Sequence, residues 1–221
     1  MVHFKKFLRG SELMLTEIIF SVLIAVALTF IGTRWINFLY AMPNAPLSFP
    51  DEVESRAKFR KPCLFLLLTI CIFNLWTIPA PKIFYVAAAI FILSLIIFTD
   101  FEQYVIFDKM LLPFALIGGV AIFHLNLPLV ERLIAAIIGG GIFLLLAILS
   151  RGGIGGGDIK LVAVLGMWLG IEKLLNVIII AAIAGGIVAV ILILTKQKDR
   201  KSYFAYGPYF ALAAIYILIF G

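Results

Sequence analysis

Residues 153–160 read Gly153-Ile154-Gly155-Gly156-Gly157-Asp158-Ile159-Lys160, and they place an acidic residue behind a run of glycines at the start of an apolar segment. Glycines let the backbone turn tightly and approach another chain closely, because they carry no side chain. A helix that begins near Asp158 would turn its free N–H groups and the positive end of its dipole toward that carboxylate. A glycine hinge followed by an N-capping aspartate is the structural explanation. An aspartate at membrane depth, however, marks a functional site by default.

The sequence around this motif is that of a membrane protein. The chain has 221 residues, of which 64% are hydrophobic and 14% charged, and its mean hydropathy is +1.17. Soluble domains carry roughly 25% charged residues. A helix needs about 20 apolar residues to cross a bilayer. The apolar runs therefore predict an all-α polytopic membrane protein with about eight transmembrane helices, at about 15–36, 63–78, 83–99, 110–126, 130–149, 159–171, 173–194 and 204–220.

Two of these runs leave a detail open. The run 159–171 is too short for a comfortable crossing, so its start should lie inside the protein and line a polar cavity. Residues 159–194 could also form one helix kinked around Gly170 and Glu172, which would reduce the count to seven.

The basic residues predict the orientation. With eight helices, one set of loops holds ten of them and the opposite set holds three, namely Lys82, Arg132 and Lys173. The richer set should face the cytoplasm, and both Asp100 and Asp158 fall on that side. The net charge of +6 thus reflects topology, and we expect no nucleic-acid partner. The ten residues are Arg56, Lys58, Arg60, Lys61, Lys109, Arg151, Lys196, Lys198, Arg200 and Lys201.

Three further basic residues lie on the wrong side of the first helix for this orientation. They are Lys5, Lys6 and Arg9, in the tail before the first apolar run. We expect this tail to lie along the membrane interface as a short amphipathic piece.

The residue types exclude most catalytic chemistries. Cys63 and Cys71 stand eight residues apart in one apolar run, which is not the spacing of metal ligands. A serine or cysteine hydrolase needs a histidine beside its nucleophile, but His3 lies in the tail and His124 lies on the side opposite the acidic loops. We therefore expect no metal and no cofactor, and a hydrolase would have to use carboxylates.

A second carboxylate stands at the end of the run 83–99. Asp100 would face the negative end of its helix dipole, a costly placement that capping does not explain. Glu102 lies farther out, and Asp108 suits the N-cap of a helix from Lys109 onward. Two carboxylates brought together cannot both ionise cheaply, so one pocket holds an acid and a base. Asp100 and Asp158 could thus activate a water for attack on a peptide carbonyl.

Three segments of the chain resemble the type IV prepilin peptidases, in the same order. They are Asp100-Phe101-Glu102 with Ile106 and Asp108, the GxGxGDxKL-like run Gly153–Leu161, and the segment Phe204–Leu212, which resembles the family's closing Phe-Gly-Pro segment. The resemblance implies a GxGD aspartyl endopeptidase of the bacterial inner membrane. It would remove the basic leader of prepilin or pseudopilin precursors after a glycine, at the cytoplasmic face. Asp100 and Asp158 would be catalytic, supported by Gly153, Gly155, Gly157, Lys160 and Glu102.

The N-terminal part matches this family less well. Arg34-Trp35-Ile36-Asn37, with prolines after it, is similar to the start of a cytoplasmic insert in bifunctional members. Those members carry two zinc-binding CxxC pairs and methylate the new N-terminus. This chain has no CxxC, and only residues 42–62 are available for an insert. We therefore expect a short form without methyltransferase activity, divided into an N-terminal helix and loop (1–62) and a peptidase membrane domain (63–221).

Three alternatives remain open at this stage. An archaeal preflagellin-type peptidase shares the same motif. A presenilin-type protease would have a Tyr-Asp pair where this chain has Thr99-Asp100. A carboxylate-based ion transporter would also place acids at glycine-broken helices, although its acids commonly lie near the midplane and its fold often shows inverted repeats.

Overall fold

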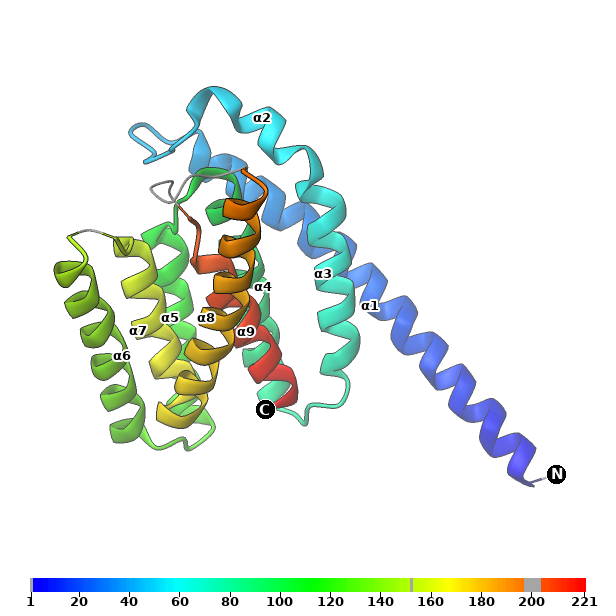
Figure 1. Cartoon of the computed structure of the whole chain (residues 1–221). Helices are drawn as coiled ribbons and strands as arrows, with labels where there is room; N and C mark the ends of the chain where they lie inside the picture. Colours follow the sequence, from blue (N-terminus) through cyan, green and yellow to red (C-terminus); the bar gives the residue numbers. More distant parts are fainter. Residues whose placement is uncertain (1, 152, 197–203) are drawn as a thin grey trace.

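A computed structural model describes residues 2–151, 153–196 and 204–221, with side chains from Met14 onward (Figure 1). The described chain is built from helices joined by short loops. Lys198, Arg200 and Lys201, which contribute to the predicted orientation, lie outside the described residues. The α-helices are α1 (Val2–Tyr40), α2 (Val53–Arg56), α3 (Arg60–Leu75), α4 (Lys82–Gln103), α5 (Asp108–His124), α6 (Leu129–Leu149), α7 (Gly156–Leu169), α8 (Ile171–Leu194) and α9 (Gly207–Phe220).

Each predicted apolar run forms a helix, and within the described ranges four segments are long and apolar enough to cross a membrane. These are Met14–Tyr40, Lys82–Gln103, Leu129–Leu149 and Ile171–Leu194. The fold is therefore an all-α multi-pass membrane protein. Gly170, with φ of 79°, separates α7 from α8, so this region is two helices rather than one kinked helix. The predicted interfacial tail is not a separate piece, because α1 is continuous from Val2.

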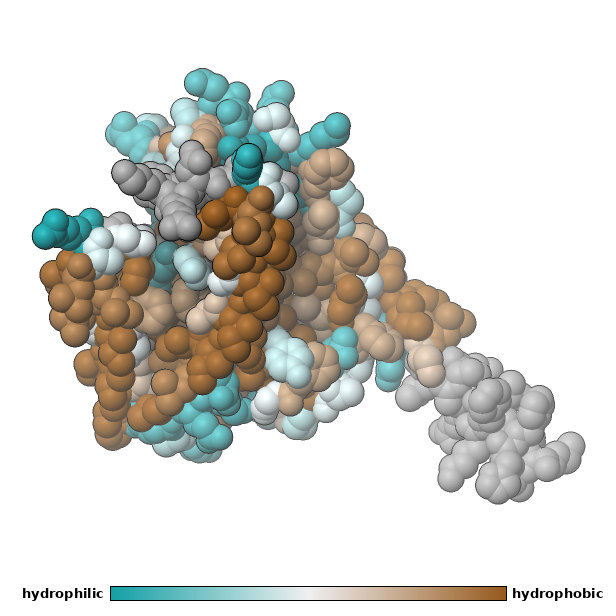
Figure 2. All heavy atoms as spheres, viewed as in Figure 1, coloured by the Kyte–Doolittle hydropathy of each residue, from teal (hydrophilic) through white to brown (hydrophobic). Residues whose placement is uncertain are grey.

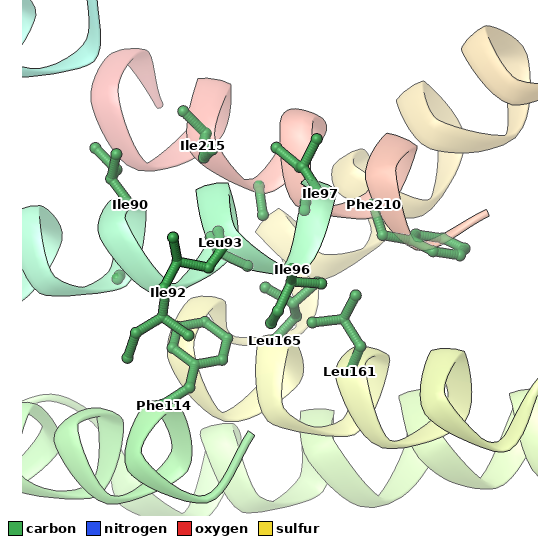
Figure 3. Packing of buried hydrophobic residues seen from close by; sticks show 14 of the residues in the cluster. Ile90, Ile92, Leu93, Ile96, Ile97, Phe114, Leu161, Leu165, Phe210 and Ile215 are labelled. Carbon is green, nitrogen blue, oxygen red and sulfur yellow. The ribbon is translucent and has the colours of Figure 1, made fainter. Parts of the chain in front are cut away.

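Helix α4 is the centre of the bundle. Its side chains are apolar around most of the helix, which is typical of a helix buried on several faces. Figure 3 shows Ile90, Leu93 and Ile96 of α4 among residues of α5, α7 and α9. Because α4 is held from several sides, the position of its last turn is fixed by packing.

The outer helices carry the lipid-facing surface. Figure 2 shows an apolar band over α6 and α8 between more hydrophilic ends of the molecule. Glycines let these helices approach closely: a Cβ on Gly166 of α7 would lie 2.6 Å from the carbonyl oxygen of Ala135 in α6. Gly139 and Gly140 of α6 and Gly185 of α8 also face neighbouring side chains. By contrast, a Cβ on Gly141 or Gly186 would meet nothing within 4 Å.

Candidate active site

The candidate site lies where three helix termini meet at one end of the bundle (Figure 1). Helix α4 ends there, and α7 and α9 begin there. The α4–α5 connection joins them: Ile106 lies against Gly157 at the start of α7 and against Gly207 at the start of α9. A Cβ on Gly157 would lie 3.0 Å from the Cβ of Ile106, so this contact leaves little room for a side chain.

Asp100 stands in the last turn of α4 and is 6% exposed. The helix stops at Tyr104, whose left-handed backbone (φ 51°) brings its N–H within 3.0 Å of the Asp100 carbonyl oxygen. The backbone amide of Gly207 interacts with the Asp100 carboxylate. A Cβ on Gly207 would lie only 2.6 Å from Oδ2 of Asp100. The positive end of the α9 dipole thus offsets the unfavourable dipole end of α4.

Asp158 stands in the first turn of α7, as the sequence predicts. The helix begins at Gly156, and Gly155 precedes it with an extended backbone (φ −68°, ψ 142°). The backbone amide of Gly155 interacts with the Asp158 carboxylate. This carboxylate therefore also lies at a helix N-terminus, where negative charge is favourable.

The fold brings these two aspartates together from distant parts of the chain. Their carboxylates are close enough to interact electrostatically. Oδ2 of Asp100 and Oδ1 of Asp158 are buried and have no hydrogen-bond partner among the described residues. Two neighbouring carboxyl groups with free oxygens can act as an acid and a base on one bound molecule. Of the described residues, no group of three or more His, Cys, Asp or Glu could hold a metal ion.

Lys160 lies on the exposed side of the site. Its ammonium group contacts both carboxylate oxygens of Asp108, at 2.7 and 2.8 Å. This exposed ion pair links α7 to the first turn of α5. Asp108 belongs to α5 itself, whose N-cap is Phe107 rather than Asp108.

Glu102 lies in the same helical turn as Asp100 but is buried away from the second aspartate. It is 5% exposed and forms an ion pair with Arg60, which is 2% exposed. The sequence places Glu102 farther out than Asp100, because the apolar run ends at residue 99. The helix in fact continues to Gln103, and the partner lies 42 positions earlier in the chain.

Sequence reasoning missed two residues of the site. Arg60 was counted only as a loop charge that sets the orientation, and the sequence carries no local signal of a buried partner. Gly207 belongs to the segment Phe204–Leu212 that resembles the family, but its contact with Asp100 follows only from the fold.

Comparison with known proteins finds one matching family and several relatives. Residues 87–190 match the type IV leader peptidase family, and they include both Asp100 and Asp158. This region belongs to the type IV leader peptidase family. The prepilin leader peptidase/N-methyltransferase of Xanthomonas campestris pv. campestris is 29% identical over 128 residues, which cover 55% of this chain and 45% of the relative.

Two other relatives carry the same name. That of Aeromonas salmonicida is 30% identical over 138 residues, covering 59% of this chain and 47% of the relative. That of Neisseria gonorrhoeae is 33% identical over 126 residues, covering 53% of this chain and 42% of the relative. The chain thus aligns with less than half the length of these curated relatives. No solved structure matches the chain.

Proposed function

We propose that this protein is a membrane aspartyl endopeptidase that removes the leader peptide of prepilin-like precursors. The observation that carries the proposal is the meeting of Asp100 and Asp158 at three helix termini, inside the region that belongs to the leader peptidase family. One carboxylate would take a proton from a water that attacks the scissile carbonyl. The other would protonate the oxyanion and then the leaving amine. No covalent intermediate is needed.

The supporting residues would act on the shape of this site. The backbone of Gly153 and Gly155, before α7, would let an extended substrate segment lie close to the enzyme. Gly157, in the first turn of α7, would instead let that helix pack against Ile106. Lys160 would keep α7 and α5 together through Asp108, and Glu102 would support Asp100 from the same turn of α4. A substrate that lies so close to the backbone needs a small residue before the cut, which fits cleavage after glycine.

The site would open to the cytoplasm of a bacterial inner membrane. The end of the bundle that carries the site also holds Arg56, Lys58, Lys61, Lys109 and Arg151, and basic residues that flank membrane helices favour the cytoplasmic side. The precursor would then enter as a membrane helix with its basic leader on the cytoplasmic side.

Methyl transfer is not part of the proposed activity, although the relatives' names include it. The chain contains no CxxC pair, and its segment 41–59 folds back on the end of α4 through hydrogen bonds between Phe49 and Gln103. This segment would be a reduced remnant of the insert of bifunctional enzymes.

A defined cleavage assay tests the function. The purified protein in nanodiscs would be incubated with a prepilin precursor, in parallel with a preflagellin precursor, and with S-adenosylmethionine present. We expect prepilin cut after the leader's glycine, with a free amine at the new N-terminus. Mass spectrometry identifies both the cut and any added methyl group. If the precursor stays intact although the enzyme is folded in the nanodiscs, the proposed peptidase activity is contradicted. If methylation of the new N-terminus depends on the enzyme, the interpretation of segment 41–59 as a reduced remnant is contradicted.

A further inference from the structure

A buried charged cluster joins the N-terminal segment to the helix that carries Asp100. Nε of Arg60 donates to both carboxylate oxygens of Glu102, at 2.8 and 3.0 Å, and Nη2 of Arg60 also donates to Oε2. The hydroxyl of Tyr40 donates to the same Oε2 at 3.1 Å. Nη1 of Arg60 donates to Oδ1 of Asn37 at 2.6 Å. Residues from α1, α3 and α4 thus meet in one network.

The charges of this network are satisfied within it. A carboxylate and a guanidinium that are both almost fully buried need such pairing, because an unpaired charge there is very costly. The forked contact also fixes orientation, since arginine binds a carboxylate in a planar, two-point geometry that lysine cannot reproduce. The position of Glu102 is therefore set by α1 and α3.

Glu102 cannot reach the substrate of the proposed reaction from this position. Successive residues of an α-helix are turned by about 100°, so two residues two apart are turned by about 200° and point to nearly opposite sides. Asp100 points toward α7 and α9, and Glu102 points toward α1 and α3. A fixed Glu102 therefore holds the same helical turn that carries Asp100.

A second set of contacts holds the next residue of α4. Gln103 is fully buried, and its side chain amide makes a reciprocal pair with the backbone of Phe49, at 2.9 and 3.1 Å. The N–H of Ser48 donates to the Gln103 carbonyl at 3.3 Å. Nη1 of Arg56 donates to the Glu102 carbonyl, also at 3.3 Å. Both the carbonyl groups and the side chains at the end of α4 are thus bound by segment 48–60.

We propose that Arg60 is a positioning residue of the active site. Through Glu102 it holds the last turn of α4, and so sets the carboxylate of Asp100 against Asp158. Segment 48–60 then contributes to the peptidase activity, because it fixes the end of α4, the helix that carries Asp100. We call this set of contacts the clamp. This inference rests on the proposed function of the two aspartates. The structural part, that Arg60 holds the last turn of α4, does not depend on that function.

The kcat and KM for precursor cleavage by Arg60→Gln and Glu102→Gln test whether Arg60 positions Asp100 for catalysis. A misplacement of about 1 Å at a reacting group costs on the order of 100-fold in rate, so kcat should fall by about that factor while KM stays near the wild-type value. Lys58→Gln is the matched control, because it removes one exposed basic charge two residues away. The exchanged pair Arg60→Glu with Glu102→Arg should recover part of the rate that each single change loses. A wild-type kcat in folded Arg60→Gln would overturn the proposal.

Hydrogen–deuterium exchange tests the clamp without any substrate. In Arg60→Lys, which keeps the charge and loses the fork, amides of residues 101–104 should exchange about ten-fold faster, while those of residues 160–168 should not change. Unchanged exchange at 101–104 would overturn the clamp. If the wild-type protein cleaves no precursor, the proposed function fails, and the exchange result still decides whether Arg60 holds α4. If Arg60→Gln does not fold, Arg60→Lys and the exchanged pair supply the kinetic comparison.

Discussion

Asp100 occupies the most costly position among the residues of the site. It lies at the C-terminal end of α4, where the helix dipole is negative, and it is almost fully buried. The start of α9 compensates, because the Gly207 amide faces the carboxylate. A charge at a helix end is worth about 0.3–1 kcal/mol and somewhat more when partly buried. Glycine is required at residue 207 because any side chain would occupy the space of the carboxylate.

Gly207→Ala should therefore damage the site directly. The added Cβ would lie 2.6 Å from Oδ2 of Asp100 and 2.9 Å from Cδ1 of Ile106, so the carboxylate must move. We expect a loss of kcat on the order of 100-fold, by the same positional argument. Gly186→Ala is the control, since its Cβ would meet nothing within 4 Å. Equal kcat in the two variants, measured on equal amounts of folded protein, would show that the contact does not position Asp100.

The helices themselves were largely predictable from the sequence, because apolar runs and glycines mark them. Glycines mark the bounds of α7 and α8. Gly170 separates the two helices, and the glycines before Asp158 mark the start of α7. With 14 residues, α7 is about 21 Å long, shorter than the roughly 30 Å hydrocarbon core. Leu161, Val162 and Leu165 in the middle of this helix are buried, whereas its first residue, Gly156, is exposed. The polar cavity expected at its start stays a prediction.

The contacts between helices were not predictable to the same extent. In a membrane helix nearly every face is apolar, so periodicity does not reveal which face meets which neighbour. The pairing of Arg60 with Glu102 crosses 42 residues of sequence, and no local pattern connects them. The continuous α1 was also missed, because the basic residues before its apolar part suggested a break. The two aspartates could be predicted as a pair because each stands at the end of an apolar run on the same side.

At the scale of the whole molecule, charge and apolar surface divide the protein into an apolar band and two hydrophilic ends (Figure 2). The acidic residues of the site share one end with segment 41–60 and the loop before α7 (Figure 1). Lys82, Arg132 and Lys173 lie near the other ends of α4, α6 and α8. From this distribution and the positive-inside rule, we expect the site-bearing end to face the cytoplasm.

Single cysteines test this orientation. The single cysteines are introduced into a variant without Cys63 and Cys71. Ser150→Cys lies at the end of the bundle that carries the site, Asn126→Cys lies at the opposite end, and both positions are exposed. A membrane-impermeant thiol reagent should label Asn126→Cys in spheroplasts and Ser150→Cys only in inside-out vesicles. The reverse pattern would place the site on the outer side of the membrane.

The central claim is that Asp100 and Asp158 act as one catalytic pair. The most direct measurement is the single-turnover cleavage rate of Asp100→Asn, Asp158→Asn and the double variant, each folded in nanodiscs with the same prepilin precursor. An amide cannot exchange the protons that the reaction needs. Each single variant should therefore lose all measurable cleavage. The double variant should lose no more, because residues that act as a unit are not additive. A wild-type rate in either single variant would contradict the account.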